Sequence, residues 1–264
     1  MTRWARRALF GATVAIVAVA CVELGGPSAG VVSISNLTLP YPSVVIGDLM
    51  RDSLGDPSPV SITAYGSDGK AIPGEPVSFF ALDTTVRIDA DGTIHGLFRD
   101  SVGARVVGGA GGLQTPPQRV IVTIAPTTVI KDETPTAIAF VVIEPDTSKS
   151  TNWSPPLILT VKGGTAPAQG YVVTYTIVQA PDAEVAGTPT AYIGDETARA
   201  MPRDTTDTKG IASRRVVLRQ TAIAEATRAG TKQDSVIVRA TVKYLGADVP
   251  GSPVEFIVPV FKKP

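Results

Sequence analysis

The 264-residue sequence predicts an all-β fold in which two antiparallel β-sandwich domains follow an N-terminal hydrophobic helix. Three observations carry this prediction. The chain holds 25 Gly and 22 Pro, both above their average frequencies, as expected for short strands joined by tight turns. Runs of alternating apolar and polar residues are separated by turn sequences along the chain past Pro27. One stretch of the sequence also recurs 96 residues later.

The charge and the rare residues exclude several classes of protein. The 24 basic and 24 acidic residues balance, whereas a dedicated nucleic-acid binder needs a basic face. The single cysteine, Cys21, and the single histidine, His95, exclude a disulfide scaffold and a Cys/His zinc site. No nucleophile motif accompanies His95, the one imidazole available for catalysis. We therefore expect a protein that is not an enzyme, binds no cofactor and has no nucleic-acid partner.

Residues 1–26 are expected to form a signal or membrane-anchor segment. Three arginines and no acidic residue precede 15 uncharged residues, 8–22, which is the pattern of an export signal. The residues expected to form the anchor are Arg3, Arg6, Arg7, Leu9, Phe10 and Ile16. The positive-inside rule keeps the arginines in the cytoplasm, so both β domains are expected on the periplasmic or extracellular side of the cell membrane.

The end of this segment, Ala18-Val19-Ala20-Cys21, resembles a bacterial lipoprotein signal. The resemblance implies cleavage before Cys21 and acylation of that residue, which would make membrane lipid a partner of the N-terminus. The alternative is an uncleaved helix, although its 15 apolar residues are fewer than the roughly 20 that a span needs.

The first domain is expected over residues 27–126 and the second over 127–264, with limited hinge freedom in the connection 125–135. The strands expected in the first domain are 31–39, 44–50, 60–65, 77–82, 86–88, 93–98, 104–107 and 119–124. Spacings of 8–16 residues between strand starts are typical of an antiparallel sandwich. The side chains expected in the two cores are Val60, Ile62, Val77, Phe79, Ile94 and Val120, and Leu157, Leu159, Val173, Tyr175, Val217, Val236 and Val238.

The repeat aligns residues 64–81 with 160–177 without a gap, so that Gly74 meets Gly170. Further on, Asp91-Gly92 resembles Lys209-Gly210 at an offset of 118 residues. The second domain therefore carries about 22 extra residues, which we place in an insert near 181–204. A short helix is possible at 221–229.

These motifs resemble bacterial immunoglobulin-like domains. The first domain is similar to repeats of bacterial surface proteins in its Ser67-Asp68-Gly69 turn and in Pro73-Gly74 before Val77. The second is similar to the invasin and intimin type, in the segments 170–175, 206–212 and 236–240. The resemblance implies two β-sandwiches and no activity, because this fold hosts many functions.

The candidate partner-binding residues are Trp153, Tyr192, Arg199, Met201 and Arg203. Trp153 stands in a Pro-rich loop, where an aromatic side chain is either an interface anchor or a core plug. The other four lie in the insert, and long loops on a rigid scaffold often carry function.

No metal site is expected. Asp89 and Asp91 are a weak alternative for calcium, with a plain hairpin turn favoured, because an EF-hand needs Glu where Asp100 stands.

The sequence thus predicts a non-catalytic, membrane-tethered, extracytoplasmic structural or interaction protein. In the favoured hypothesis it is an extrinsic subunit that braces a larger membrane complex through integral membrane subunits. That complex could be respiratory, secretory or a photosynthetic reaction-centre and antenna assembly, and the residues do not distinguish these. The alternative is a surface lipoprotein that acts as an adhesin or polysaccharide-binding module.

Overall fold

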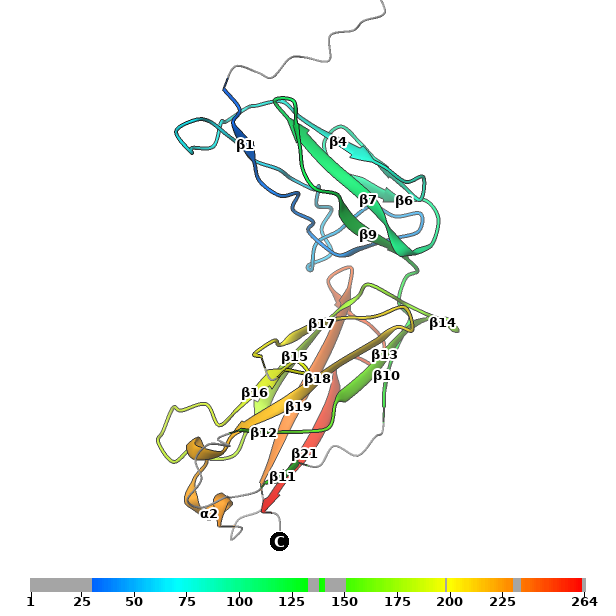
Figure 1. Ribbon diagram of the computed structural model, residues 1–264. Coiled ribbons are helices and arrows are strands. Elements are labelled where there is room, and N and C mark those ends of the chain that lie inside the picture. Colours follow the sequence, from blue (N-terminus) through cyan, green and yellow to red (C-terminus); the bar gives the residue numbers. More distant parts are fainter. Residues whose placement is uncertain (1–29, 133–137, 141–150, 198, 230–233, 263–264) are drawn as a thin grey trace, which may run out of the picture.

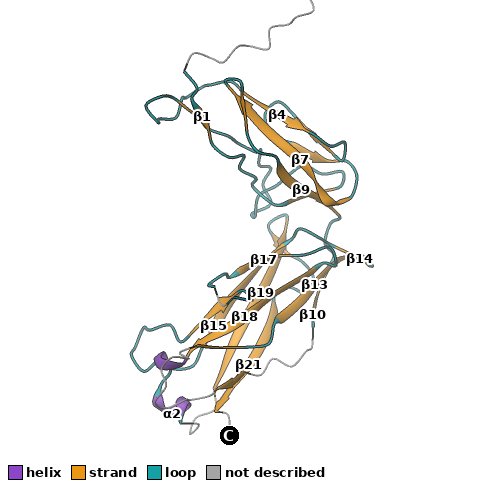
Figure 2. Cartoon of the chain, viewed as in Figure 1, coloured by secondary structure: helices purple, strands orange, loops and turns teal. Residues whose placement is uncertain are grey.

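The computed structural model describes residues 30–132, 138–140, 151–197, 199–229 and 234–262 as two β-sandwich domains that lie end to end (Figure 1). Strands dominate both domains, and the helical turns lie at the far end of the second (Figure 2). The predicted anchor segment, with Cys21, lies outside the described residues. Within the described part of the chain, no helix has both the length and the apolar character needed to cross a membrane.

The first domain contains one four-stranded path and two short strand pairs. The main sheet has the order β2 (Ser43–Val45), β9 (Gln118–Thr123), β7 (Asp100–Ala110) and β4 (Val77–Ala81), with β8 (Leu113–Gln114) also paired to β7. The short pairs are β1 (Ser33–Ile34) with β3 (Ala64–Tyr65), and β5 (Val86–Ile88) with β6 (Ile94–Gly96). Strand β2 runs parallel to β9, and the other pairs are antiparallel.

The second domain contains two larger sheets. The first has the order β10 (Thr128–Lys131), β13 (Leu157–Gly163), β18 (Ile211–Arg219) and β12 (Thr151–Trp153), with β14 (Ala166–Pro167) on β13 and β16 (Ala191–Gly194) on β18. The second has the order β11 (Ile138–Phe140), β21 (Val254–Lys262), β19 (Asp234–Tyr244), β15 (Val172–Gln179) and β17 (Arg203–Thr205), with β20 (Ala247–Asp248) on β19. The 3-10 turn η1 (Gln220–Ala222) and the helix α2 (Glu225–Arg228) fall where a short helix was predicted.

The strand order is that of an immunoglobulin-like sandwich. In such a fold the first, second, fifth and fourth strands form one sheet, and the third, sixth and seventh form the other. The second domain matches this order with β10, β13, β18 and β16 against β15, β19 and β21. In the first domain β4, β7 and β9 form the equivalent second sheet, and a parallel strand lies beside the last strand of each domain. The predicted fold class is confirmed.

Each sandwich has its own apolar core, and most of the predicted core side chains lie in it. Two predictions were wrong. Val77 is 40% exposed, because it begins β4 at the edge of the sheet. Val217 is fully buried but does not join the core, which its neighbours Val216 and Leu218 enter from the other face of β18. The predicted strands 31–39 and 60–65 pair over only two residues each, plus the bridge between Thr38 and Ser61.

The turn before β6 in the first domain and the turn before β18 in the second are built in the same way. Gly92 and Gly210 both have a positive φ, at 88° and 74°. The carbonyl oxygen of Gly92 accepts the backbone N–H of Val60, and that of Gly210 accepts the N–H of Val161. A Cβ on either glycine would lie 2.6 Å from the Val60 oxygen or 2.4 Å from the Val161 oxygen. The repeat at an offset of 118 residues is therefore a structural repeat.

We expect Gly210→Ala to destabilise the second domain by about 3 kcal/mol, because the new methyl adds a clash with the Val161 backbone to the cost of a positive φ. Gly74→Ala is the matched control. Gly74 also has φ at 74°, but no atom lies within 4 Å of the position that the alanine methyl would take, so the φ cost of about 1 kcal/mol stands alone. Urea unfolding of both variants measures the difference, and equal losses of stability would contradict this account.

Candidate functional site: the domain junction and an aromatic face

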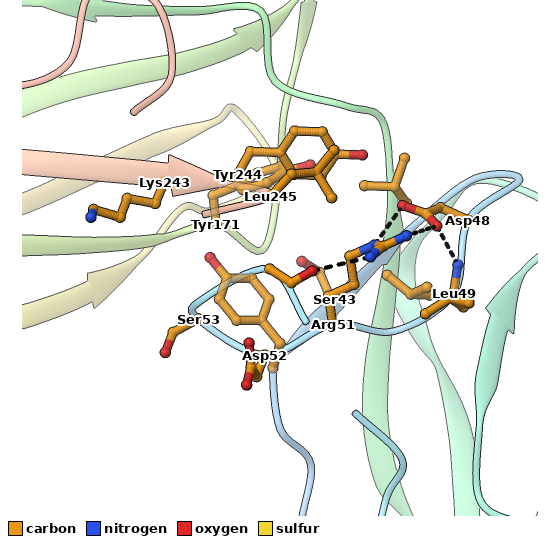
Figure 3. Close-up of a pocket in the computed structure, with 14 residues that line it drawn as sticks. Ser43, Asp48, Leu49, Arg51, Asp52, Ser53, Tyr171, Lys243, Tyr244 and Leu245 are labelled. Atoms are coloured by element: carbon orange, nitrogen blue, oxygen red, sulfur yellow. Dashed lines mark hydrogen bonds and ion pairs between the residues drawn. The ribbon is translucent and has the colours of Figure 1, made fainter. Parts of the chain in front are cut away.

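Hydrogen bonds, one of them buried, join the two domains beside the chain connection. The backbone N–H of Val172 donates to the Tyr41 hydroxyl oxygen at 2.8 Å, and the Ser43 hydroxyl donates to the Gly170 carbonyl at 2.9 Å. Ser43 is buried in this contact, and Figure 3 shows it near Tyr171. The backbone just before β15 is thus bound by the segment that leads into β2 of the first domain.

Close packing completes this junction. The Tyr171 hydroxyl donates to the Ile124 carbonyl at 2.8 Å, and Val45 and Ile124 pack against the core of the second domain. A Cβ on Gly170 would lie 2.7 Å from the Ser43 Cβ, so the repeated glycine is needed here for close approach as well as for its φ of 82°. Burial raises the pKa of the Tyr41 and Tyr171 hydroxyls above the usual range, which keeps both neutral. These contacts restrain a hinge between the domains.

An ion pair lies at the edge of the junction. The Arg51 guanidinium donates to both carboxylate oxygens of Asp48 at 3.1 Å and to the Gly55 carbonyl at 3.0 Å, which closes the loop 48–55 (Figure 3). The bonds from Arg51, helped by the Tyr244 hydroxyl, hold the pKa of Asp48 below its ordinary value. The cleft between this loop and Tyr244 has a volume of about 40 Å³, room for a few waters but far less than a small-molecule site.

Two of the predicted partner-binding residues lie on the same outer face of the sheet that contains β13 and β18. Trp153 on β12 and Tyr192 on β16 are the cross-strand neighbours of Val217 on β18, one on each side. Directly opposed residues project to the same face of a sheet. Trp153 is 50% exposed, and the Arg219 guanidinium lies 5.2 Å from the centre of the Tyr192 ring. We call Trp153, Tyr192, Val217 and Arg219 the aromatic face.

Arg215 belongs beside this face, and the prediction missed both it and Arg219. The Arg215 guanidinium donates to the Ser154 carbonyl at 3.0 Å and so supports the strand end that carries Trp153. The signal was present in the sequence: Arg215, Val217 and Arg219 alternate along β18 and therefore share a face.

The insert is more ordered than predicted, and its residues do not form one surface. It contains β16 and the start of β17, of which the first extends one sheet and the second extends the other. The Asp195 carboxylate accepts the backbone N–H groups of Thr197 and Arg199 and closes the turn between them. Arg199 is exposed near this turn, Met201 follows it, and Arg203 lies on β17 in the opposite sheet from the aromatic face.

Asp89 and Asp91 form turn contacts. Asp91 accepts the backbone N–H of Thr93 at 2.9 Å and its hydroxyl at 3.0 Å. Asp89 lies 2.8 Å from Nε2 of His95 and 3.2 Å from Arg87. These contacts support the interpretation as a hairpin turn. In the described ranges no three His, Cys, Asp or Glu side chains gather as a metal-binding group.

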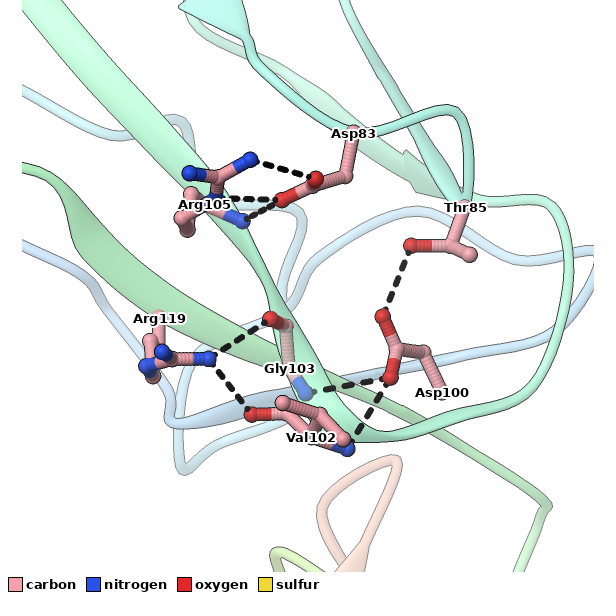
Figure 4. Close-up of polar contacts among 7 residues, drawn as sticks. All are labelled: Asp83, Thr85, Asp100, Val102, Gly103, Arg105 and Arg119. Carbon is pink, nitrogen blue, oxygen red and sulfur yellow. Dashed lines mark hydrogen bonds and ion pairs between the residues drawn. The ribbon is translucent and has the colours of Figure 1, made fainter.

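A polar cluster on the first domain shapes an irregular part of β7 (Figure 4). Arg105 donates to both oxygens of Asp83, at 3.0 and 2.9 Å, and holds the pKa of Asp83 at about 2. Asp100 accepts the backbone N–H groups of Val102 and Gly103, where the pairing of β7 with β9 shifts register. Every carboxylate of the cluster is committed to a partner, which assigns it a structural role.

No protein-family model and no curated protein sequence matches the chain. Among solved structures it is similar to the Yersinia pseudotuberculosis adhesin InvE, with 20% identity and a TM-score of 0.30 over 91% of this chain and 62% of that one. It is also similar to the D0-D1 domain of intimin, with 18% identity and a TM-score of 0.26 over 84% of this chain and 98% of that one. A third similar structure is that of FdeC, an Escherichia coli adhesin, with 16% identity and a TM-score of 0.27 over 86% of this chain and 65% of that one.

These neighbours are bacterial adhesins with immunoglobulin-like domains, the type that the sequence resembles. The chain spans about three fifths of the length of InvE. The strand order of each domain gives the fold independently of these neighbours.

We expect Tyr41→Phe to loosen the junction, because the half-buried N–H of Val172 loses its acceptor at a cost of about 1 kcal/mol. Small-angle scattering and NMR relaxation of the two domains should then report independent motion. Tyr65→Phe is the control, since no hydrogen bond of the Tyr65 hydroxyl is found in the described part of the chain. Unchanged coupling in Tyr41→Phe would show that the hydroxyl does not hold the domains together.

The ion pair of Asp48 predicts a pH dependence. The pKa of Asp48 is lowered on folding. The carboxylate therefore stabilises the fold at pH values above its ordinary pKa of 3.8, and this contribution disappears as the pH falls through the folded pKa. The stability difference between the wild type and Asp48→Asn should therefore be present at pH 6 and shrink below pH 3.8. Urea unfolding across this range checks it, and a constant difference would argue against the ion pair.

Proposed function

We propose that this chain is a non-catalytic interaction protein, held at the outer side of a cell membrane by its N-terminal segment, that braces a larger membrane complex. The observation that carries the proposal is the locked junction between the two domains. Two sandwiches that cannot pivot freely act as a rigid spacer, which is what a bracing subunit requires and what a flexible tether would not supply.

The aromatic face supplies the contact surface of this proposal. Interface hot spots are enriched in Trp, Tyr and Arg, and here one of each lies around Val217. Trp153 is 50% exposed although it stands on a strand, where its position is set by the ladder to β18. A rigid, half-exposed aromatic side chain loses little conformational freedom when it enters a partner's pocket.

The expected partner is an integral membrane subunit. Purification of the full-length protein from its native membrane in mild detergent should recover it in fixed stoichiometry with such a subunit. Trp153→Ala should weaken the association by about 2 kcal/mol or more, the scale of a hot-spot residue. Phe98→Ala is the control, because Phe98 is 65% exposed on the first domain and lies away from the aromatic face.

Two results would contradict the proposal. If gentle solubilisation always releases the protein alone, it is not a subunit of a membrane complex, and the adhesin hypothesis then gains. If Trp153→Ala and Phe98→Ala weaken the association equally, the aromatic face is not the contact surface. Mass spectrometry of the native N-terminus separates an acylated Cys21 from an intact anchor helix.

A further inference from the structure

A groove of about 480 Å³ lies beside the domain junction. Its floor is the outer face of the sheet formed by β17, β15 and β19, where Thr174 stands directly between Arg203 and Thr241. The first domain supplies an apolar wall with Pro40, Pro42 and Leu54, of which Leu54 is 70% exposed. This volume falls in the range of ligand sites, unlike the small cleft at Asp48.

The two charged residues that line the groove have the same sign, and Asp248, the cross-strand neighbour of Lys243, is not among the lining residues. Of the ten residues that line it, Arg203 and Lys243 are cationic and none is acidic. Both cations are exposed, and neither forms an ion pair with any residue that the structure describes. Figure 3 shows Lys243 extending away from Tyr171 and Tyr244, on the side of the junction where Ser53 lies.

The sheet sets the spacing between the two cations. Arg203 lies two strands away from Thr241, and Lys243 follows Thr241 by two residues on the same face. Strands about 4.8 Å apart with a rise of about 3.4 Å per residue place the two Cα atoms roughly 12 Å apart. In an extended peptide, carboxylates two to four residues apart span roughly 7–13 Å.

We propose that this groove binds an extended acidic peptide segment of a protein partner. Its carboxylates pair with Arg203 and Lys243, the hydroxyls of Thr174 and Thr241 meet its polar groups, and an apolar side chain between the carboxylates packs on the wall. The pyrrolidine rings of Pro40 and Pro42 and the side chain of Leu54 suit such an apolar side chain. The site lies in the opposite sheet from the aromatic face and is independent of it.

The test uses the full-length protein in detergent and a fluorescein-labelled, capped pentapeptide, Asp-Leu-Glu-Leu-Asp. The peptide in which Asn and Gln replace the acids is its matched probe. We expect the acidic peptide to bind and to lose affinity as salt is raised. Lys243→Glu should weaken binding at least about tenfold, Arg203→Glu likewise, and Lys70→Glu, an equal charge change at an exposed turn of the first domain, should not.

Three results would overturn the proposal: equal binding of the acidic and neutral peptides, equal weakening by Lys243→Glu and Lys70→Glu, or binding of polygalacturonate in place of the peptide. Circular dichroism of each variant confirms that it is folded, which is expected because the substituted side chains are exposed. Co-purification with a membrane subunit should persist in Lys243→Glu, so a failure here is distinct from a failure of the proposed function.

Discussion

The hydrogen bond from the Val172 backbone to the Tyr41 hydroxyl is one of the contacts that fix the relative position of the two domains. It acts together with the bond from Ser43 to Gly170, which is buried, so that leaving its groups unpaired would be costly. The wall of the cationic groove belongs to one domain and its floor to the other, so the groove exists only while these bonds hold. The rigidity that the proposed bracing role requires depends on the same bonds.

Glycines with a positive φ occupy equivalent turns in the two domains, but their surroundings differ. The carbonyls of Gly92 and Gly210 each accept a backbone N–H, from Val60 ahead of β3 and from Val161 on β13. Gly74 and Gly170 share a backbone conformation, but only Gly170 is pressed against another domain. The repeat therefore preserves the positive φ of this glycine, but only the copy in the second domain contacts the other domain.

Local patterns predicted much of this molecule, and the misses have physical causes. Strand alternation and turn glycines located both sandwiches, because the period of two and a positive φ are properties of the chain itself. The placement of Trp153 and Tyr192 on either side of Val217 was not predictable, since it depends on which strands flank β18. The same holds for the groove, whose cations come from β17 and β19 and whose wall comes from the other domain. The insert was expected to be a loop because its two strands are short and join different sheets.

Strand β17, which begins in the insert, forms one edge of a sheet in the second domain. In the second domain the sheet that carries the groove ends at β17, which is three residues long. In the first domain the corresponding sheet ends at β4, five residues long, where Val77 and Phe80 are exposed. Short edge strands discourage edge-to-edge pairing between molecules. At this edge, the second domain is therefore less open than the first to strand pairing with another molecule.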